Sequence, residues 1–221
     1  MNMKKNILLI TLLICSLTSF SQNIIEYNGE KINELDENNN QTGIWKLFDE
    51  EKKILITCEF KNSEFISNTN FYKESKLIAS YNNVDKLEIY KDSKVTICSF
   101  HKKEDNSTTL IDEKGNEIDI ETKKYYTFSA AQVMPMFYGG TKKLYEFIGN
   151  NFNSNGNKGR VEVKFKIDPK GFATEIEIKS STNEKLNEEA IRIISIMPRC
   201  QPAYQRGIFV KYPYVIPITI N

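Results

Sequence analysis

Few side chains in this sequence could do covalent chemistry, and their spacing does not assemble a catalytic set. His101 is the single histidine. It follows Cys98 by three positions, so in a strand the two side chains point to opposite faces and cannot form a nucleophile–base pair. Glu188 and Glu189 are neighbours in a predicted helix and do not share a face, as an acid–base pair would need to. They suit the first helical turn, where carboxylates are stabilising. We expect no enzyme activity and no catalytic residue.

Sites for metals, phosphates and charged polymers are not indicated either. No two cysteines have the Cys-x-x-Cys spacing of a zinc site. Gly139-Gly140 lacks the Lys-Ser/Thr that ends a P-loop, so we interpret it as a turn into a helix with Thr141 as the N-cap. The formal net charge of +1, from 30 basic and 29 acidic residues, gives no long-range attraction to nucleic acid or anionic lipid. We predict no metal, cofactor, small-molecule substrate or nucleic-acid partner.

The first 21 residues have the three parts of a secretory signal peptide. They combine a basic start, an apolar stretch and small residues before the cleavage point: Lys4 and Lys5, Ile7–Leu17, and Ser19-Phe20-Ser21. The apolar stretch of about 11 residues is short against the ~20 that span a bilayer. We therefore expect cleavage and export, and keep an uncleaved N-terminus that anchors the chain in the inner membrane as the alternative.

Export affects how the cysteines are interpreted. Cys15 leaves with the signal, and Ile14 before it argues against a lipoprotein because a small residue is expected there. Cys58, Cys98 and Cys200 remain, an odd number that allows one disulfide and one thiol. Cys58 and Cys98 lie in alternating segments and could pair if those strands are neighbours. We favour the interpretation that all three are small buried apolar residues.

The composition, with 40% apolar and 27% charged residues, is that of a globular protein. From Asn23 to Lys124, short runs rich in Ile, Phe, Tyr and Thr alternate with polar turns, which indicates an antiparallel meander. The predicted strands are Ile44–Phe48, Ile54–Phe60, Ser67–Tyr72, Leu77–Tyr81, Leu87–Tyr90 and Val95–Phe100, with a hairpin turn at Gly115-Asn116. The division we predict is a signal peptide over 1–21, the meander over 22–124 and a second domain over 125–221.

The second half alternates helices and strands. Apolar residues at helical spacing between Leu144 and Phe152 predict one amphipathic helix, and those between Leu186 and Met197 predict another. Between them, the alternating run Arg160–Ile167, the turn Asp168-Pro169-Lys170-Gly171 and a second alternating run from Phe172 to Lys179 predict a β-hairpin. A final strand spans Val210–Ile220. For the second helix, Ser181 with Glu184 matches a capping box, and Asn183 and Asn187 are alternative starts. The order helix–hairpin–helix–strand predicts an α+β fold, with two helices on a three-stranded antiparallel sheet.

Motifs in this half follow the order of a known family. Val133-Met134-Pro135-Met136-Phe137-Tyr138-Gly139-Gly140 resembles the MP-x-F-x-GG motif that leads into the first helix of TonB C-terminal domains of the Bacteroidetes type. Gly159–Gly171 is similar to the family's first hairpin, and Leu186–Arg192 to its second helix. Met197-Pro198-Arg199 and the terminal Ile216-Pro217-Ile218 complete the order. The first half is weakly similar, around Gln41–Asn62, to MORN-like hairpin repeats of exported bacterial proteins; a meander without repeats explains these residues equally well.

The sequence departs from the family's pattern in its loops and its membrane attachment. Cys200 stands where a tryptophan is usual, Pro202-Ala203 where Pro-Gly is usual, and the loop Asn153–Lys158 is short and lacks Tyr-Pro. A full TonB protein keeps its N-terminal helix in the inner membrane and crosses the periplasm on a Pro-rich linker, whereas this chain has only 6 prolines. The resemblance implies a periplasmic energy-transducer-like module rather than a complete transducer.

The resemblance also implies a way of binding partners. In the family, an extended N-terminal segment of an outer-membrane transporter adds as a strand to the last strand of the sheet. Pro213 and Pro217 each remove a donor and restrict which side of that strand can pair. The alternative is that the β-rich first half is the working surface of a structural envelope protein. Whether the protein forms a homodimer is left open. Carried over to this sequence, the peptide-binding residues are Val210, Lys211, Tyr212, Tyr214, Val215 and Ile216.

Overall fold

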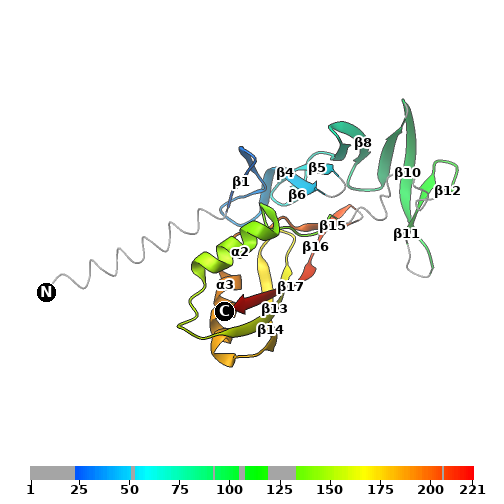
Figure 1. Ribbon diagram of the computed structural model, residues 1–221. Helices are drawn as coiled ribbons and strands as arrows, with labels where there is room; N and C mark the ends of the chain where they lie inside the picture. Colours follow the sequence, from blue (N-terminus) through cyan, green and yellow to red (C-terminus); the bar gives the residue numbers. More distant parts are fainter. Residues whose placement is uncertain (1–22, 51–52, 92, 105–107, 119–132, 206) are drawn as a thin grey trace. The chain divides into compact units, whose positions relative to one another are not determined.

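The computed structural model describes residues 23–50, 53–91, 93–104, 108–118, 133–205 and 207–221 (Figure 1). The predicted signal peptide and the predicted junction at Lys124 lie outside these residues. The described chain forms two compact units, one made of residues up to Lys46 with Thr57–Ser67, the other of Leu47–Ile56 with Asn68–Asn221. Each unit is described by itself. The division at residues 21 and 124 stays a prediction.

The first unit is a group of strands around one tryptophan. Trp45 is fully buried, its indole N–H lies 3.2 Å from the carbonyl oxygens of Glu34 and Thr42, and its ring meets Phe60 edge-on at 5.6 Å. A buried indole that keeps a hydrogen-bond partner can fill a small core without a desolvation penalty. The strands of this unit, two of which run on into the second unit, are β1 (Ile25–Tyr27), β2 (Glu30–Ile32), β3 (Glu34–Leu35), β4 (Gln41–Asp49), β5 (Ile54–Lys61) and β6 (Glu64–Phe65).

In the second unit, the predicted meander is confirmed. Six strands follow one another in sheet order β12-β11-β10-β9-β8-β7, with antiparallel pairing between neighbours. The turn at Gly115-Asn116 is also as predicted, since Asp112 N–H donates to the Asn116 carbonyl and Gly115 N–H to the Asp112 carbonyl. The strands are β7 (Thr69–Lys73), β8 (Lys76–Tyr81), β9 (Lys86–Lys91), β10 (Lys94–Lys102), β11 (Thr108–Asp112) and β12 (Glu117–Ile118).

The C-terminal part of this unit has the predicted helix–hairpin–helix–strand order, so the α+β fold class is confirmed (Figure 1). A three-stranded antiparallel sheet in the order β14-β13-β17 packs against two α-helices. Alternate residues of β13, from Val161 to Ile167, face the helices and are at most 1% exposed. The elements are α2 (Gly140–Asn151), β13 (Gly159–Ile167), β14 (Ala173–Ser181), a 3-10 turn η1 (Glu184–Leu186), α3 (Asn187–Ser195) and β17 (Tyr212–Ile220).

Both helix starts differ from the simplest expectation. The prediction of Thr141 as N-cap is wrong: α2 begins at Gly140, and Gly139 caps it in the left-handed conformation, with φ of 87°. The reason is that the two glycines take positive φ values, which bring the chain into the helix before a hydroxyl cap is reached. At the second helix, the Asn183 side chain accepts from Lys185 N–H and caps the 3-10 turn η1. The α-helix itself begins at Asn187, another of the predicted starts, and its N-cap Leu186 gives no side-chain bond, so the predicted capping box of Ser181 with Glu184 is wrong.

The predicted strand Val210–Ile220 is in fact two strands. Ala203–Gln205 (β15) and Ile208–Val210 (β16) form their own small hairpin, and β17 begins at Tyr212. This hairpin completes the core of the meander: Tyr204 is 1% exposed and lies between Phe71 at 6.0 Å and Phe209 at 5.3 Å. This hairpin was not predicted from the sequence, because its two strands are only three residues each and too short to show alternation.

A buried amide fixes this hairpin to the rest of the unit. Gln201 is fully buried, and its side chain accepts from Phe48 N–H at 2.7 Å and donates to the Phe48 carbonyl at 2.8 Å. The same amide donates to the Met134 carbonyl at 3.3 Å. Gln201 therefore acts as a substitute strand partner for Phe48, and the two polar backbone groups of Phe48 are satisfied by a side chain.

The three described cysteines are buried and form no disulfide with one another, as the favoured interpretation predicted. Burial raises the pKa of Cys98 to about 11 and that of Cys200 to about 12. It also raises the pKa of Cys58. Thiols with raised pKa values stay protonated at neutral pH and are poor nucleophiles, so these residues serve as apolar packing.

The turn between β13 and β14 generates a stability prediction. Gly171 has a φ of +95°, and a methyl group there would lie 2.1 Å from the Cys200 carbonyl oxygen. We expect Gly171→Ala to lower the free energy of unfolding by at least about 2 kcal/mol, because backbone strain is added to a clash with main chain. Urea denaturation measures this.

Gly156→Ala is the matched control. Gly156 also has a positive φ, +78°, but a methyl group there meets no atom within 4 Å. Only the backbone strain of roughly 1 kcal/mol should remain. Equal losses in the two variants would mean that the contact with Cys200 does not constrain the turn.

Candidate functional site

The outer edge of β17 is shaped by two prolines. β17 pairs with β13 over its whole length, and Pro213 and Pro217 stand opposite Lys166 and Glu162. A proline has no N–H to give to the ladder, so both prolines must occupy the pairs that make no hydrogen bonds with β13. Successive residues of a strand turn their backbone groups to opposite sides. The odd-numbered residues of β17 therefore present their backbone groups to the side away from β13.

On that side no strand of the described chain pairs with β17. β17 is an end strand of its three-stranded sheet. Between the two prolines, Val215 offers both an N–H and a carbonyl, and beyond them Thr219 does the same. Both residues are exposed. An edge of this kind is a template for one more strand, and its outward N–H donors are those of Val215 and Thr219.

The structure distributes the six predicted binding residues among different roles. Val215 is 42% exposed and lies on the open edge, whereas Ile216 is 2% exposed and belongs to the core. Tyr214 packs on Phe165 with ring centroids 5.6 Å apart. The remaining three are Tyr212, which starts β17, Lys211, which bonds Glu175 at 2.8 Å, and Val210, which lies in β16 rather than β17.

Beside the end of β17 lies a groove that the sequence did not indicate. Its volume is about 500 Å³, and one wall is α2 while the other is the last part of β17. Helical spacing could have identified Tyr145, Gly149 and Phe152 as one strip of α2, but nothing in the sequence brings that strip to β17. The lining residues are Tyr145, Ile148, Gly149, Phe152, Ser154, Arg160, Pro217, Ile218, Thr219 and Ile220.

One contact crosses the groove and agrees with the orientation derived from the prolines. The Tyr145 hydroxyl donates to the Pro217 carbonyl at 3.1 Å. This carbonyl must point away from β13 to be reached from α2. Both partners are partly accessible, so the bond contributes little to stability and can be exchanged for another donor.

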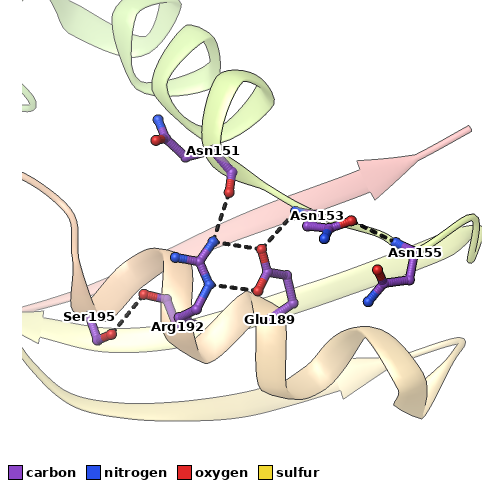
Figure 2. Close-up of polar contacts among 6 residues, drawn as sticks. All are labelled: Asn151, Asn153, Asn155, Glu189, Arg192 and Ser195. Atoms are coloured by element: carbon purple, nitrogen blue, oxygen red, sulfur yellow. Dashed lines mark hydrogen bonds and ion pairs between the residues drawn. The ribbon is translucent and has the colours of Figure 1, made fainter. Parts of the chain in front are cut away.

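The far end of α2 is held in place by a polar network (Figure 2). Arg192 on α3 donates to the Asn151 carbonyl, the last residue of α2, at 2.7 Å, and forms two bonds of 2.7 Å with Glu189. Glu189 in turn accepts from Asn153 N–H at 2.7 Å. A cation at a helix C-terminus is favourable for the helix dipole. The bond from Arg192 also holds the pKa of Glu189 below its ordinary value.

The sheet face opposite the helices carries a lattice of ion pairs. Lys166 and Lys211 both bond Glu175, and these bonds lower its pKa to about 2. Lys164 pairs with Glu177, and Glu162 with Arg160 and Lys179. All these groups are solvent-accessible, so each pair is worth little. Together they keep this face polar, whereas the groove beside β17 is lined by both apolar and polar groups.

The described residues contain no cluster of three or more His, Cys, Asp or Glu side chains that could hold a metal ion. None of the helices in this part of the chain is long and apolar enough to cross a membrane.

The network in Figure 2 generates a prediction for the loop after α2. Replacing Glu189 by alanine removes the acceptor of Asn153 N–H, so we expect the hydrogen exchange of that amide to become several-fold faster. Glu188→Ala, which removes the same charge from an exposed neighbour on α3, should leave it unchanged. NMR measurement of amide exchange distinguishes the two; equal rates in both variants would show that the network does not hold the loop.

Comparison with known proteins agrees with this architecture. The model of one family, described as Gram-negative bacterial TonB protein C-terminal, matches residues 151–220. The match takes in both strands of the hairpin, α3 and β17, and begins at the last residue of α2. Searches of curated proteins and of solved structures each found no match. The resemblance inferred from the motifs is thus confirmed for residues 151–220, which carry the sequence signature of the TonB C-terminal family.

Proposed function

We propose that this chain is an exported envelope protein that takes part in TonB-dependent transport by binding an extended peptide. The peptide, from an outer-membrane transporter or another envelope protein, adds as a fourth strand beside β17. The protein performs no chemistry in this role; it recognises its partner.

One observation carries the proposal: the open edge of β17 and its two prolines. Main-chain hydrogen bonds provide most of the affinity in strand addition, and neighbouring side-chain pockets provide selectivity. Pro213 and Pro217 leave the ladder with β13 intact and reduce the donors of the opposite edge. An edge with few donors resists pairing with arbitrary strands but still accepts a peptide in the right register.

The proposed location follows from the family and from the N-terminal sequence. Members of a TonB C-terminal family work in the envelope of Gram-negative bacteria, and residues 1–21 have the pattern of a cleavable export signal. We place the mature protein in the periplasm. Finding Gln22 or Asn23 as the first residue by mass spectrometry would support this location, whereas an intact Met1 would favour an inner-membrane anchor.

The edge generates a mutational prediction. Val215→Pro removes an N–H that points away from β13, as the two native prolines do, so the fold should tolerate it. The loss of one hydrogen bond, about 1 kcal/mol, should weaken peptide binding about fivefold. Partner proteins are first recovered from envelope extracts with the original chain. The affinity of their N-terminal peptides for each variant is then measured by fluorescence titration.

Val215→Ala is the control, because it removes the same side chain and keeps the N–H. Binding by this variant should stay within about twofold of the original chain. If Val215→Pro, shown by circular dichroism to be folded, recovers the same partners with the same affinity, strand addition at β17 is wrong.

A further inference from the structure

We propose that the groove between α2 and the end of β17 is a specificity pocket, which takes one bulky apolar side chain of the bound peptide and favours an acidic residue next to it. This inference rests on the proposed function and adds the kind of sequence that the site selects. The groove has a volume of about 500 Å³, which lies within the range of roughly 300–1,000 Å³ that is common for ligand pockets.

The first supporting feature is a glycine inside α2. Apart from proline, glycine is the least favourable residue in a helix interior, yet Gly149 lies within Gly140–Asn151. Glycines in such places usually allow another part of the protein to pack closely, but a methyl group on Gly149 would meet no atom within 4 Å. Gly149 instead borders the groove. Its missing side chain therefore leaves space that the fold itself does not fill.

The walls of the groove determine what can occupy this space. Phe152 and Ile220 are half-buried hydrophobic residues packed at the edge of the domain core, and Ile218 is a core residue at 2% exposure. Even-numbered residues of β17 point toward the helices. A peptide strand beside β17 shares the sheet's two faces, so every second side chain points to the same helical face. One such side chain, opposite Ile218 or Ile220, enters the groove.

The preference for an acid follows from the alternation of the strand. The residue next to the apolar anchor points to the other face of the sheet, where Arg160 stands opposite Thr219. Arg160 borders the groove, is 54% exposed, and donates to Glu162 through one nitrogen at 3.0 Å. A guanidinium has five N–H donors, so it can bond a second carboxylate. Of two successive peptide residues, an apolar one therefore fills the groove and an acidic one bonds Arg160 on the other face of the sheet.

The test is a selection of short random peptides displayed on phage against the immobilised chain and its variants. The original chain should enrich peptides with an apolar residue beside an acidic one. Gly149→Leu fills the groove from its own wall and should lose the apolar enrichment, with roughly tenfold weaker binding of the best selected peptide. Gly149→Ala is the matched control, because a methyl group leaves most of the groove empty, and it should keep both the enrichment and the affinity.

A second pair of variants tests the charge. Arg160→Gln should retain the apolar enrichment and lose the acidic one, whereas Lys164→Gln, on the same sheet face but not bordering the groove, should retain both. Thermal melts confirm folding, and Gly149→Leu is expected to be folded because it replaces glycine in a helix with a better helix former and meets open space.

The outcomes separate this inference from the proposed function. Peptides that bind the original chain and Gly149→Leu equally, and lose affinity only with Val215→Pro, would overturn the pocket and leave strand addition in place. If no peptide is enriched by the original chain, strand addition fails, and the pocket with it. Enrichment that differs between Gly149→Leu and Gly149→Ala, and between Arg160→Gln and Lys164→Gln, supports the pocket.

Discussion

The arrangement of the C-terminal sheet depends on the missing N–H groups of Pro213 and Pro217. Because neither residue can donate to β13, both must turn their backbones away from it, and this fixes the orientation of every other residue in β17. The even-numbered residues then hold the ladder and place Ile216 and Ile218 in the core. The odd-numbered residues form the outer edge. One constraint of covalent chemistry thus sets which alternate residues of the strand pair with β13 and which present their backbone to the outer edge.

The surroundings of this edge are made rigid by contacts that do not touch it. Arg192 and Glu189 hold the end of α2 to α3, so the helical wall of the groove has a fixed position (Figure 2). At the other end, Gly171 allows the β13–β14 turn to lie against Cys200, whose N–H donates to the Gly171 carbonyl at 2.8 Å. A recognition site on a rigid frame loses little entropy when a peptide binds.

The sequence predicted the parts of this protein whose periodicity is local. The alternation in Arg160–Ile167, the helical spacing after Leu186 and the turn at Asp168–Gly171 all appear in the structure because each is decided by neighbouring residues. The predicted binding residues were taken from one strand, and that strand contains a core residue, Ile216, as well as the edge residue Val215. The groove was missed because it joins α2 to residues about 70 positions later, and a single sequence carries no periodic signal for such a contact.

The hairpin β15–β16 has a consequence for the order in which the protein can fold. Tyr204 belongs to the meander's apolar cluster and Phe209 packs against it, and Gln201 bonds the backbone of Phe48, although more than 150 positions separate Gln201 from Phe48. A chain made from its N-terminus has all six strands β7–β12 long before it has these residues. The meander therefore stays incompletely packed until nearly the last residues emerge, and contacts of such long sequence separation make folding slow.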